Sequence, residues 1–397
     1  MKPVEIAKNV WWVGAIDWNI TNFHGHTYTV KRGTTYNAYL IIDEKITLVD
    51  GVYGPFIQEM LERISKIVDP SKIDYIIANH IEADHSSSFP ELMKICPKAK
   101  FFGTQKCKKG LERMYYLGLD FQVVKTGDKL SLGKKTVHFI EAAMIHWPDS
   151  MFSYLAEDNI LFSNDAFGQH YATDKRFNDE VDQVLLMEET VKYYANILLH
   201  LSGVISKKLD DIKKLNLPIK IIAPSHGVIW RNNPLKIFDT YVLWAQQPTK
   251  QKAVIVYETM WGATTKMASQ IADGLIKSGI ETVVFEVNST DRTEIMGEMM
   301  DAKCFILGSS THDNDMLPNF AAFMEFIKGL KPKNRIAAVF GSYGWAGGAV
   351  NSIEKIAKEI GFEIVQQSLS IQYMPDKNDS EKCFNWGRDL AGKIGGK

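Results

Sequence analysis

The sequence predicts two domains: an α+β layered sandwich, followed by an α/β domain with a doubly wound parallel sheet. Two observations lead to this prediction. The chain has 397 residues, which is long for one ordinary domain. The order of strands and helices also changes near residue 250. The polar, proline-containing segment "WAQQPTKQK" (244–252) is the predicted linker, so we expect domains at 1–249 and 250–397.

Residues 1–249 contain short apolar runs that follow one another closely. They predict strands in "VWWVGA", "NAYLIID", "KITLVDG", "FQVVKTG", "KTVHFIEA", "MFSYLAE" and "NILFSND". Helical patterns lie between and after them, in "PFIQEMLERISKI" and in one long helix over 188–216. Paired strands with interspersed helices predict the layered α+β sandwich.

Residues 250–397 show a regular alternation of strands and helices. The five predicted strands are "KAVIVYE", "ETVVFEV", "AKCFILGSS", "RIAAVFGS" and "FEIVQQSLSI", the last covering 362–371. This alternation is typical of a doubly wound parallel sheet. Right-handed crossovers place helices on both faces, and ligands bind where the strands end.

Composition argues against nucleic-acid binding, secretion and a membrane span. Lys+Arg and Asp+Glu nearly cancel, at 46 against 47, and no basic stripe favours nucleic acid. The N-terminal residues lack the apolar core of a signal peptide, and no apolar run reaches the roughly 18 residues of a membrane span. The four cysteines are far apart, which is typical of a reducing compartment. We therefore expect a cytoplasmic protein.

The segment "NHIEADH" (79–85) places four possible metal ligands within six residues, just after the apolar run "IDYIIA". Three later patches, "MIHW", "SNDAF" and "PSHG", each add a donor after an apolar run. An ordinary polar loop would explain one such patch, but it does not explain why the same pattern follows four apolar runs. A strand end suits a ligand because the strand fixes it while the loop leaves the metal accessible. The predicted ligands are His80, Glu82, Asp84, His85, His146, Asp165 and His226.

The turn "YETMWGATTKMA" (257–268) lies between the first strand and first helix of the second domain. Free N–H groups at a helix N-terminus favour phosphate, and the Thr259 and Thr264 hydroxyls add donors. The turn matches neither the dinucleotide nor the nucleoside-triphosphate fingerprint. Two further loops, 308–318 and 340–349, also follow strand ends. The three loops predict a site for a phosphate-containing ligand.

The seven metal donors resemble the H-x-H-x-D-H pattern, with a later His, Asp and His, of the metallo-β-lactamase fold. That resemblance implies an αββα sandwich holding two metals. His80, Glu82 and His146 would hold one metal, and Asp84, His85 and His226 the other, with Asp165 bridging. Glu82 replaces the usual second histidine, which shifts the preference from zinc towards iron.

The turn "TMWGAT" resembles the phosphate loop of flavodoxins, which binds FMN. The resemblance implies a flavodoxin-like second domain, with Tyr343 and Trp345 near the flavin ring. The predicted FMN-binding residues are Thr259, Met260, Trp261, Gly262, Ala263, Thr264, Thr311, His312, Asn314, Ser342, Tyr343, Gly344, Trp345 and Gly347.

Both domains, in this order, resemble the flavodiiron proteins, with matches in "GTTYNAYL", "HWPDSM", "NDAFGQH", "YYANI", "PSHG" and "FGSYGW". The family implies an oxidoreductase that reduces O2 to water, NO to N2O, or both, at a non-haem di-iron centre with electrons passed through FMN. It also implies a head-to-tail homodimer, which allows a dimer of dimers. Rubredoxin or a similar protein would donate electrons, or F420 in a variant of the family. His24, His170 and Tyr193 would lie behind the ligands and would orient them or deliver protons; the alternative is that they are ordinary structural residues of loops, core and helix packing.

Two positions depart from the family pattern, and a third, His85, matches a direct iron ligand of most relatives. Ala263 removes a frequent phosphate-binding serine, and Ser310 replaces a frequent proline, which we expect to loosen the second flavin loop. His85 is displaced by water in some relatives. Two alternatives remain: a metal-dependent hydrolase with an appended flavodoxin domain, and a flavin electron carrier with an N-terminal docking scaffold. The sequence does not distinguish O2 from NO.

Overall fold

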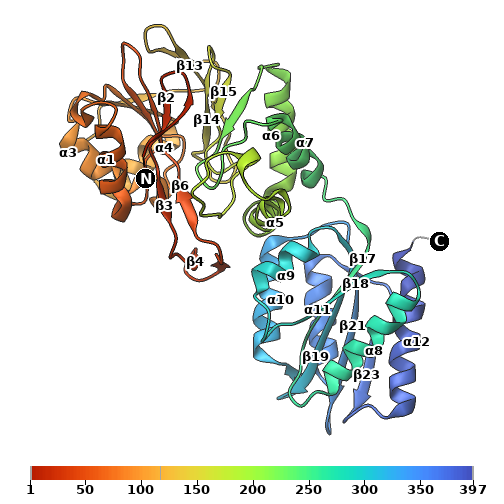
Figure 1. Cartoon of the computed structure of the whole chain (residues 1–397). Helices are drawn as coiled ribbons and strands as arrows, with labels where there is room; N and C mark the ends of the chain where they lie inside the picture. The colour runs from red at the N-terminus through yellow and green to blue at the C-terminus, as the bar shows by residue number, and fades with distance from the viewer. Residues whose placement is uncertain (1, 117, 396–397) are drawn as a thin grey trace. The chain divides into compact units, whose positions relative to one another are not determined.

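The computed structural model describes residues 2–116 and 118–395 and divides the chain into two compact units (Figure 1). The first unit comprises Met1–Tyr193 and Leu201–Ala245, and the second Tyr194–His200 and Gln246–Lys397. The main division thus falls close to the predicted linker, while a short earlier segment groups with the second unit. The domain boundary at 249/250 stays a prediction.

Two sheets face one another in the first unit. In spatial order, the first contains β1 (Val4–Ala7), β2 (Val10–Trp12), β7 (Tyr39–Ile41), β8 (Thr47–Val49), β9 (Tyr75–Ile77), β10 (Lys100–Gly103) and β11 (Phe121–Val123). The second contains β12 (Lys129–Ser131), β13 (Thr136–Glu141), β14 (Met151–Leu155), β15 (Ile160–Phe162) and β16 (Ile221–Ala223). This arrangement confirms the predicted layered sandwich.

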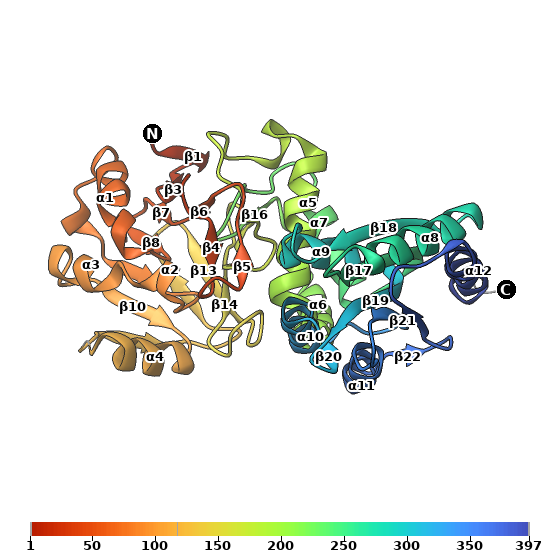
Figure 2. The same cartoon turned by 90° about the horizontal axis from the view of Figure 1, so that it is seen from below.

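Strand alternation explains why the first sheet is buried on both faces. Successive side chains point to opposite faces of a strand. Ile76 therefore packs with α1 (Ile57–Ser65), α3 (Phe89–Ile95) and α4 (Gln105–Tyr115), while Ile77 packs between the sheets. In Figure 2, α5 (Gln183–Tyr193), α6 (Ser202–Lys214) and α7 (Pro234–Ala245) lie on the opposite side of the sandwich from α1, α3 and α4. The layers are therefore helix, sheet, sheet, helix.

The single helix expected over 188–216 is wrong. Helix α5 ends at Tyr193, a π-helical turn spans Tyr194–Leu198, a 3-10 turn spans Leu199–Leu201, and α6 begins at Ser202. Nearly every side chain from Tyr194 to Leu199 is buried, so no polar face marks the helical phase. A change of phase inside such an apolar stretch leaves no signal in the periodicity.

The second unit contains the predicted doubly wound parallel sheet. Its order is β18 (Glu281–Glu286), β17 (Lys250–Glu258), β19 (Ala302–His312), β21 (Ile336–Tyr343), and then β22 (Glu363–Ile364) and β23 (Leu369–Gln372), both paired with β21. Figure 1 shows α8 (Ala263–Lys277) and α12 (Lys377–Ile394) on one side of this sheet. Helices α9 (Arg292–Met299), α10 (Pro318–Leu330) and α11 (Ala349–Ile360) lie on the other.

The strand expected over 362–371 is two short strands, which corrects the prediction. Polar side chains between them bond to the neighbouring helices. Gln366 donates to the Trp386 carbonyl at 2.9 Å, and the Trp386 ring donates to the Gln367 carbonyl at 2.8 Å. These bonds draw the segment away from β21 between its two paired stretches.

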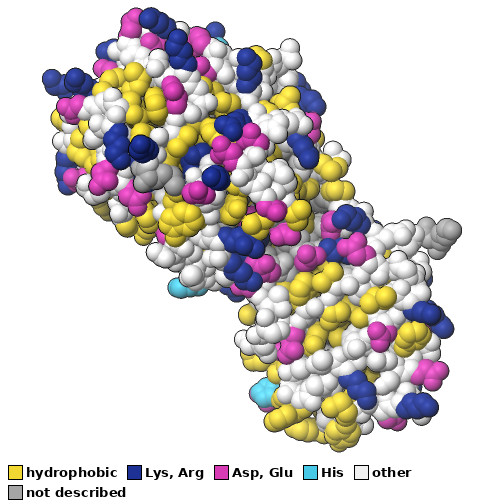
Figure 3. Space-filling model, viewed as in Figure 1, with side chains coloured by type: hydrophobic (Ala, Val, Ile, Leu, Met, Phe, Trp, Pro, Cys, Tyr) yellow, Lys and Arg dark blue, Asp and Glu magenta, His cyan; other side chains and the backbone are white. Residues whose placement is uncertain are grey.

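Charges of both signs are interspersed over the face of the molecule shown in Figure 3. Within the part of the chain that the structure describes, no helix combines the length and the apolar character needed to cross a membrane. All four cysteines are buried as free thiols.

Candidate metal centre and flavin site

The structure brings all seven predicted metal ligands together. His80 and Glu82 follow β9, and the short helix α2 (Ala83–Ser86) carries Asp84 and His85. The other three ligands follow β13, β15 and β16. The seven residues form two groups, and the ligand atoms within each group lie within 4.8 Å of one another. The first group is His80, Glu82, His146 and Asp165, and the second is Asp84, His85 and His226.

Asp165 lies between the two groups. Its Oδ2 is 2.8 Å from His146 Nε2 and 3.6 Å from His80 Nε2. Its Oδ1 is 3.0 Å from His85 Nε2 and 3.4 Å from His226 Nε2. Each carboxylate oxygen therefore faces one group, which is the geometry that a bridging ligand needs.

Several buried atoms at this centre lack hydrogen-bond partners among the described residues. They are His80 Nε2, His85 Nε2, Asp84 Oδ1 and Asp165 Oδ1. Leaving buried polar atoms unpaired is costly, so such atoms require an explanation. One metal ion held by each group would satisfy these atoms. Imidazole nitrogens with carboxylate oxygens suit iron as well as zinc, so the residues fit a two-metal centre.

Glu82 is held ionised by its neighbours. Burial acts to raise its pKa, but the neighbouring imidazoles of His146, His24 and His80 hold the pKa of Glu82 well below its usual range. Glu82 Oε2 lies 3.4 Å from both His80 Nε2 and His146 Nε2. An ionised carboxylate among imidazoles favours a bound cation.

The ligands rest on further residues that the sequence analysis missed. His80 Nδ1 lies 3.0 Å from Asp149 Oδ2, and His226 Nδ1 lies 2.7 Å from the carbonyl oxygen of Thr35. Asp149 stands three residues after His146, inside the motif "HWPDSM", so its proximity to a ligand was the available signal. A backbone carbonyl such as that of Thr35 carries no residue-specific signal.

The three residues expected behind the ligands lie beside the metal centre. His24 Nε2 is 3.3 Å from Glu82 Oε1. The His170 ring stacks on Phe23 at 4.3 Å and lies 5.0 Å from the Tyr193 ring, measured between centroids. Burial lowers the pKa of His170 well below its usual range, so this imidazole is neutral. The functional roles of His24, His170 and Tyr193 stay predictions.

A cavity of about 260 Å³ opens at the metal centre. Its floor includes the ligands Glu82 and Asp84, and His24 stands in its wall. The aromatic side chains of Phe23, Tyr36 and Tyr53, with Ile20, make much of the remaining wall apolar, together with Asn22 and Ala83. Small molecules can therefore reach two of the ligands.

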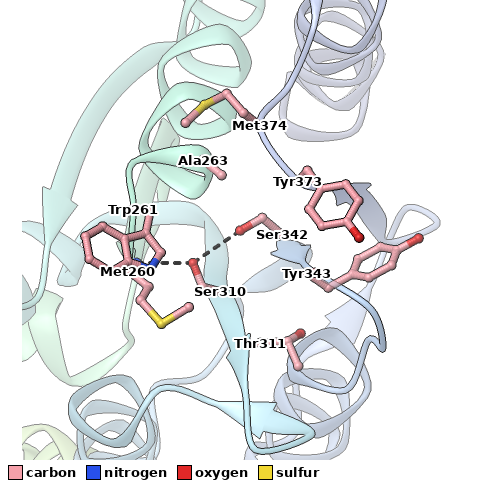
Figure 4. Close-up of a pocket in the computed structure, with 10 residues that line it drawn as sticks. Met260, Trp261, Ala263, Ser310, Thr311, Ser342, Tyr343, Tyr373 and Met374 are labelled. Carbon is pink, nitrogen blue, oxygen red and sulfur yellow. Dashed lines mark hydrogen bonds between the residues drawn. The ribbon is translucent and has the colours of Figure 1, made fainter.

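A second cavity, of about 250 Å³, lies at the carboxyl ends of β17, β19 and β21 (Figure 4). Its lining includes seven of the predicted FMN-binding residues: Met260, Trp261, Ala263, Thr311, Ser342, Tyr343 and Gly344. Ser310, Tyr373 and Met374 complete the lining. Tyr373 and Met374 follow β23, a strand whose end the sequence analysis did not consider.

The other predicted FMN-binding residues do not line this cavity: Thr259, Gly262, Thr264, His312, Asn314, Trp345 and Gly347. Some of them shape the loops instead. Thr259 Oγ1 accepts a hydrogen bond from the Gly262 N–H at 3.1 Å, and Gly262 has a φ of 86°, which favours glycine. The Trp345 side chain is 92% exposed. A role for these seven residues in FMN binding stays a prediction.

Three buried hydroxyls connect the three loops. Thr264 Oγ1 lies 2.8 Å from both Ser310 Oγ and Ser342 Oγ, and the two serine oxygens are 3.2 Å apart. The Met260 N–H also donates to Ser310 Oγ at 3.3 Å, as Figure 4 shows. These contacts run against the expectation that Ser310 loosens the second loop. The residues fit FMN, since the N-terminus of α8 offers N–H donors for phosphate beside an aromatic-walled space.

Two family models match the chain in the order of its units. Residues 34–227 match the ODP family of β-lactamases, and residues 255–387 match flavodoxin. A nitric oxide reductase of Moorella thermoacetica is 46% identical over 99% of both chains. An anaerobic nitric oxide reductase flavorubredoxin of Vibrio vulnificus is 40% identical over 98% of this chain and 79% of its own.

Solved structures agree over the full length. The rubredoxin oxygen:oxidoreductase of the anaerobe Desulfovibrio gigas superimposes with a TM-score of 0.96 at 36% identity, covering 99% of both chains. The flavodiiron protein of Giardia intestinalis superimposes with a TM-score of 0.94 at 34% identity, covering 99% of this chain and 97% of that one. Two ligand groups sharing one carboxylate, a flavodoxin unit and these full-length relatives lead to one conclusion: the chain belongs to the flavodiiron protein family.

Proposed function

We propose that this protein is an FMN-dependent oxidoreductase that reduces O2 to water, NO to N2O, or both, at a di-iron centre. The position of Asp165, with one oxygen towards each ligand group, is the observation that carries the proposal. The names of the relatives, nitric oxide reductase and rubredoxin oxygen:oxidoreductase, support both gases as substrates. Two iron ions and one FMN could together supply the four electrons that O2 needs, or the two needed to couple two NO molecules.

Each metal position has its own residues in this proposal. His80, Glu82 and His146 would hold one iron, and Asp84, His85 and His226 the other, with Asp165 shared. His85 is included because its buried Nε2 lies 3.0 Å from Asp165 Oδ1 but forms no hydrogen bond. His24, partly exposed in the cavity wall and in contact with Glu82, is placed to exchange protons between solvent and the centre.

The flavin cavity would hold the isoalloxazine beside Tyr343, with the phosphate near the N-terminus of α8. Hydrophobic side chains lie exposed around this cavity, among them Trp261 and Trp345. This exposure supports a head-to-tail homodimer in which the metal unit of a second copy covers the flavin. Rubredoxin or a similar protein is the proposed electron donor, and F420 is the alternative. Free, buried cysteines support a reducing, cytoplasmic location.

The test combines composition with turnover. We expect two irons and one non-covalent FMN per chain in protein produced with ample iron. The reduced protein should consume O2, NO or both when one reduced donor is supplied, and comparing the two rates gives the preference. Stoichiometric zinc without gas reduction would instead indicate a hydrolase. FMN without metal would indicate an electron carrier.

The dimer has a separate test. A variant lacking iron ligands and a variant lacking the flavin site should each be inactive. If flavin and iron meet across subunits, a co-expressed heterodimer of the two retains one intact pair and recovers turnover. A verified heterodimer without turnover would contradict the arrangement.

A further inference from the structure

The two metal positions have the same set of direct ligands. Each has two imidazoles and one carboxylate of its own, and both share Asp165. The direct ligands therefore give no reason for the two positions to bind a metal with different affinities. The residues behind the ligands are where the two positions differ most clearly.

Behind the first position lies a buried carboxylate. Asp149 Oδ2 is 3.0 Å from His80 Nδ1 and also accepts the Ile81 N–H at 2.9 Å. The Asp149 side chain is 2% exposed. The backbone carbonyl oxygen of Asp149 accepts a hydrogen bond from the Thr104 hydroxyl at 3.0 Å. These contacts fix Asp149, and Asp149 in turn holds the His80 ring with Nε2 facing Glu82 and Asp165.

The second position has no such carboxylate among the described residues. His226 Nδ1 faces a neutral acceptor, the Thr35 carbonyl, at 2.7 Å. His85 Nδ1 is buried without a hydrogen-bond partner. Asp50, another buried carboxylate nearby, accepts hydrogen bonds from Asn79 at 2.7 and 3.0 Å and from no histidine ring.

We propose that Asp149 makes the position formed by His80, Glu82 and His146 the tighter of the two metal positions. A carboxylate acceptor keeps the proton on His80 Nδ1, leaves the Nε2 lone pair free for a metal, and makes that nitrogen a stronger donor. A neutral carbonyl behind His226 does this less strongly. Asp149 is a positioning residue and touches no metal. The inference rests on the proposed two-metal function.

The test uses metal binding and not turnover. Metal-free, full-length protein is titrated anaerobically with Co2+, followed by visible absorption and by competition with a chelator. We expect two separable binding steps in the unmodified protein. Asp149→Asn should weaken the tighter step by about 10–100-fold, the usual effect of losing an outer partner, and leave the weaker step unchanged.

Variants that lack one metal ligand show which Co2+-binding step belongs to which metal position. His226→Ala leaves the first position intact, and His146→Ala leaves the second. Adding Asp149→Asn should weaken Co2+ binding in the His226→Ala protein and leave it unchanged in the His146→Ala protein. Asp74→Asn is a matched control, because Asp74 accepts the Ile46 N–H at 2.9 Å in the same unit, away from the ligands. Equal weakening of both positions, or weakening only in the His146→Ala protein, would overturn the inference.

A second measurement does not require the Asp149 variant to fold. During slow extraction of Co2+ from the unmodified protein by a chelator, the metal of the second position should leave first. The remaining spectrum should then match that of the His226→Ala protein. A remaining spectrum that matches the His146→Ala protein overturns the inference, as do two metals that leave together. If fewer than two metals bind at all, the proposed function fails and the inference fails with it.

Discussion

The metal centre and the flavin cavity differ in how deeply their residues are buried and in how many of their polar atoms are paired. His80, His85 and Asp165 are buried, and several of their polar atoms have no partner in the protein. The flavin cavity lies at a surface where Trp261 is 83% exposed and Trp345 is 92% exposed. One site is built from buried loops at the strand ends of two facing sheets, and the other lies on loops at the end of one sheet.

Their polar groups also differ in what satisfies them. The hydroxyls of Thr264, Ser310 and Ser342 bond to one another, so the flavin loops are connected without a ligand. The metal ligands bring buried carboxylates and imidazoles into one space, where metal ions would satisfy the unpaired atoms. The metal centre should therefore depend on its ligand more strongly than the flavin cavity does.

The largest expected effect comes from Asp165→Ala. This change removes the carboxylate that faces both ligand groups, so both metals should be lost and gas reduction abolished. The loss should exceed the roughly 10–100-fold effect typical of an outer partner. Elemental analysis and turnover measure it.

His24→Ala is the matched control, because His24 contacts Glu82 but belongs to neither ligand group. We expect it to keep both metals and to lose at most about 10–100-fold in activity. An Asp165→Ala protein with two irons and normal turnover would contradict the bridging role.

The next expected effect concerns stability. Removing the metals should lower the unfolding temperature of the first unit more than removing FMN lowers that of the second. A ligand at about 1,000 times its dissociation constant stabilises a fold by about 4 kcal/mol. Buried polar atoms of the metal ligands also lack partners once the metals are gone, whereas the flavin-loop hydroxyls stay bonded to one another.

Calorimetry of the complete, metal-free and flavin-free protein makes this comparison. Two transitions should be resolved, and each ligand should shift its own. Equal shifts for metal and flavin removal would show that the contrast between the two sites is wrong.

Strand-end positions made the main features of both sites predictable. The ligands after β9, β15 and β16 could be found because an apolar run followed by a donor is a local pattern. The parallel order of the second sheet followed from its alternating strands and helices. The π-helical turn at Tyr194–Leu198 could not be predicted, because its side chains are apolar on nearly every face.

Residues that act through tertiary contacts were harder to find. Asp149 and His80 are 69 positions apart in the sequence, and they come into contact because their two sheets face one another. Ser310 shows the same limit, because its contacts with Thr264 and Ser342 depend on three separate strand ends. Local pattern thus identified candidate ligand-binding residues, but missed residues such as Asp149 and Ser310 that hold the candidates in place.

A smaller effect is expected at the aromatic residues of the flavin site. Tyr343 lines the cavity, whereas Trp345 is exposed and does not. Stacking of an aromatic ring on a base contributes about 1–3 kcal/mol, so Tyr343→Ala should weaken FMN binding by about 5–150-fold. Trp345→Ala should weaken it less. Quenching of FMN fluorescence on binding to flavin-free protein measures both, and an equal loss would show that Trp345 covers the bound flavin.

The smallest expected effect is that of Ser310→Ala. The Ser310 hydroxyl contacts Thr264, Ser342 and the Met260 N–H, so removing it separates the second loop from the other two without removing any aromatic contact. A neutral hydrogen bond contributes about 0.5–1.5 kcal/mol, which corresponds to roughly 2–10-fold in the dissociation constant of FMN.

Ser289→Ala is the matched control for Ser310→Ala, because the Ser289 hydroxyl donates only to the exposed Glu286 carbonyl at 3.2 Å. Ala263→Ser tests the same site in the opposite direction. It adds a hydroxyl at the N-terminus of α8, where the phosphate is expected, and should tighten FMN binding. If Ser310→Ala binds FMN as tightly as the unmodified protein, the hydroxyl contacts do not organise the cavity. The flavin site would then depend on its aromatic side chains and backbone N–H groups alone, and its contrast with the buried metal centre would be still sharper.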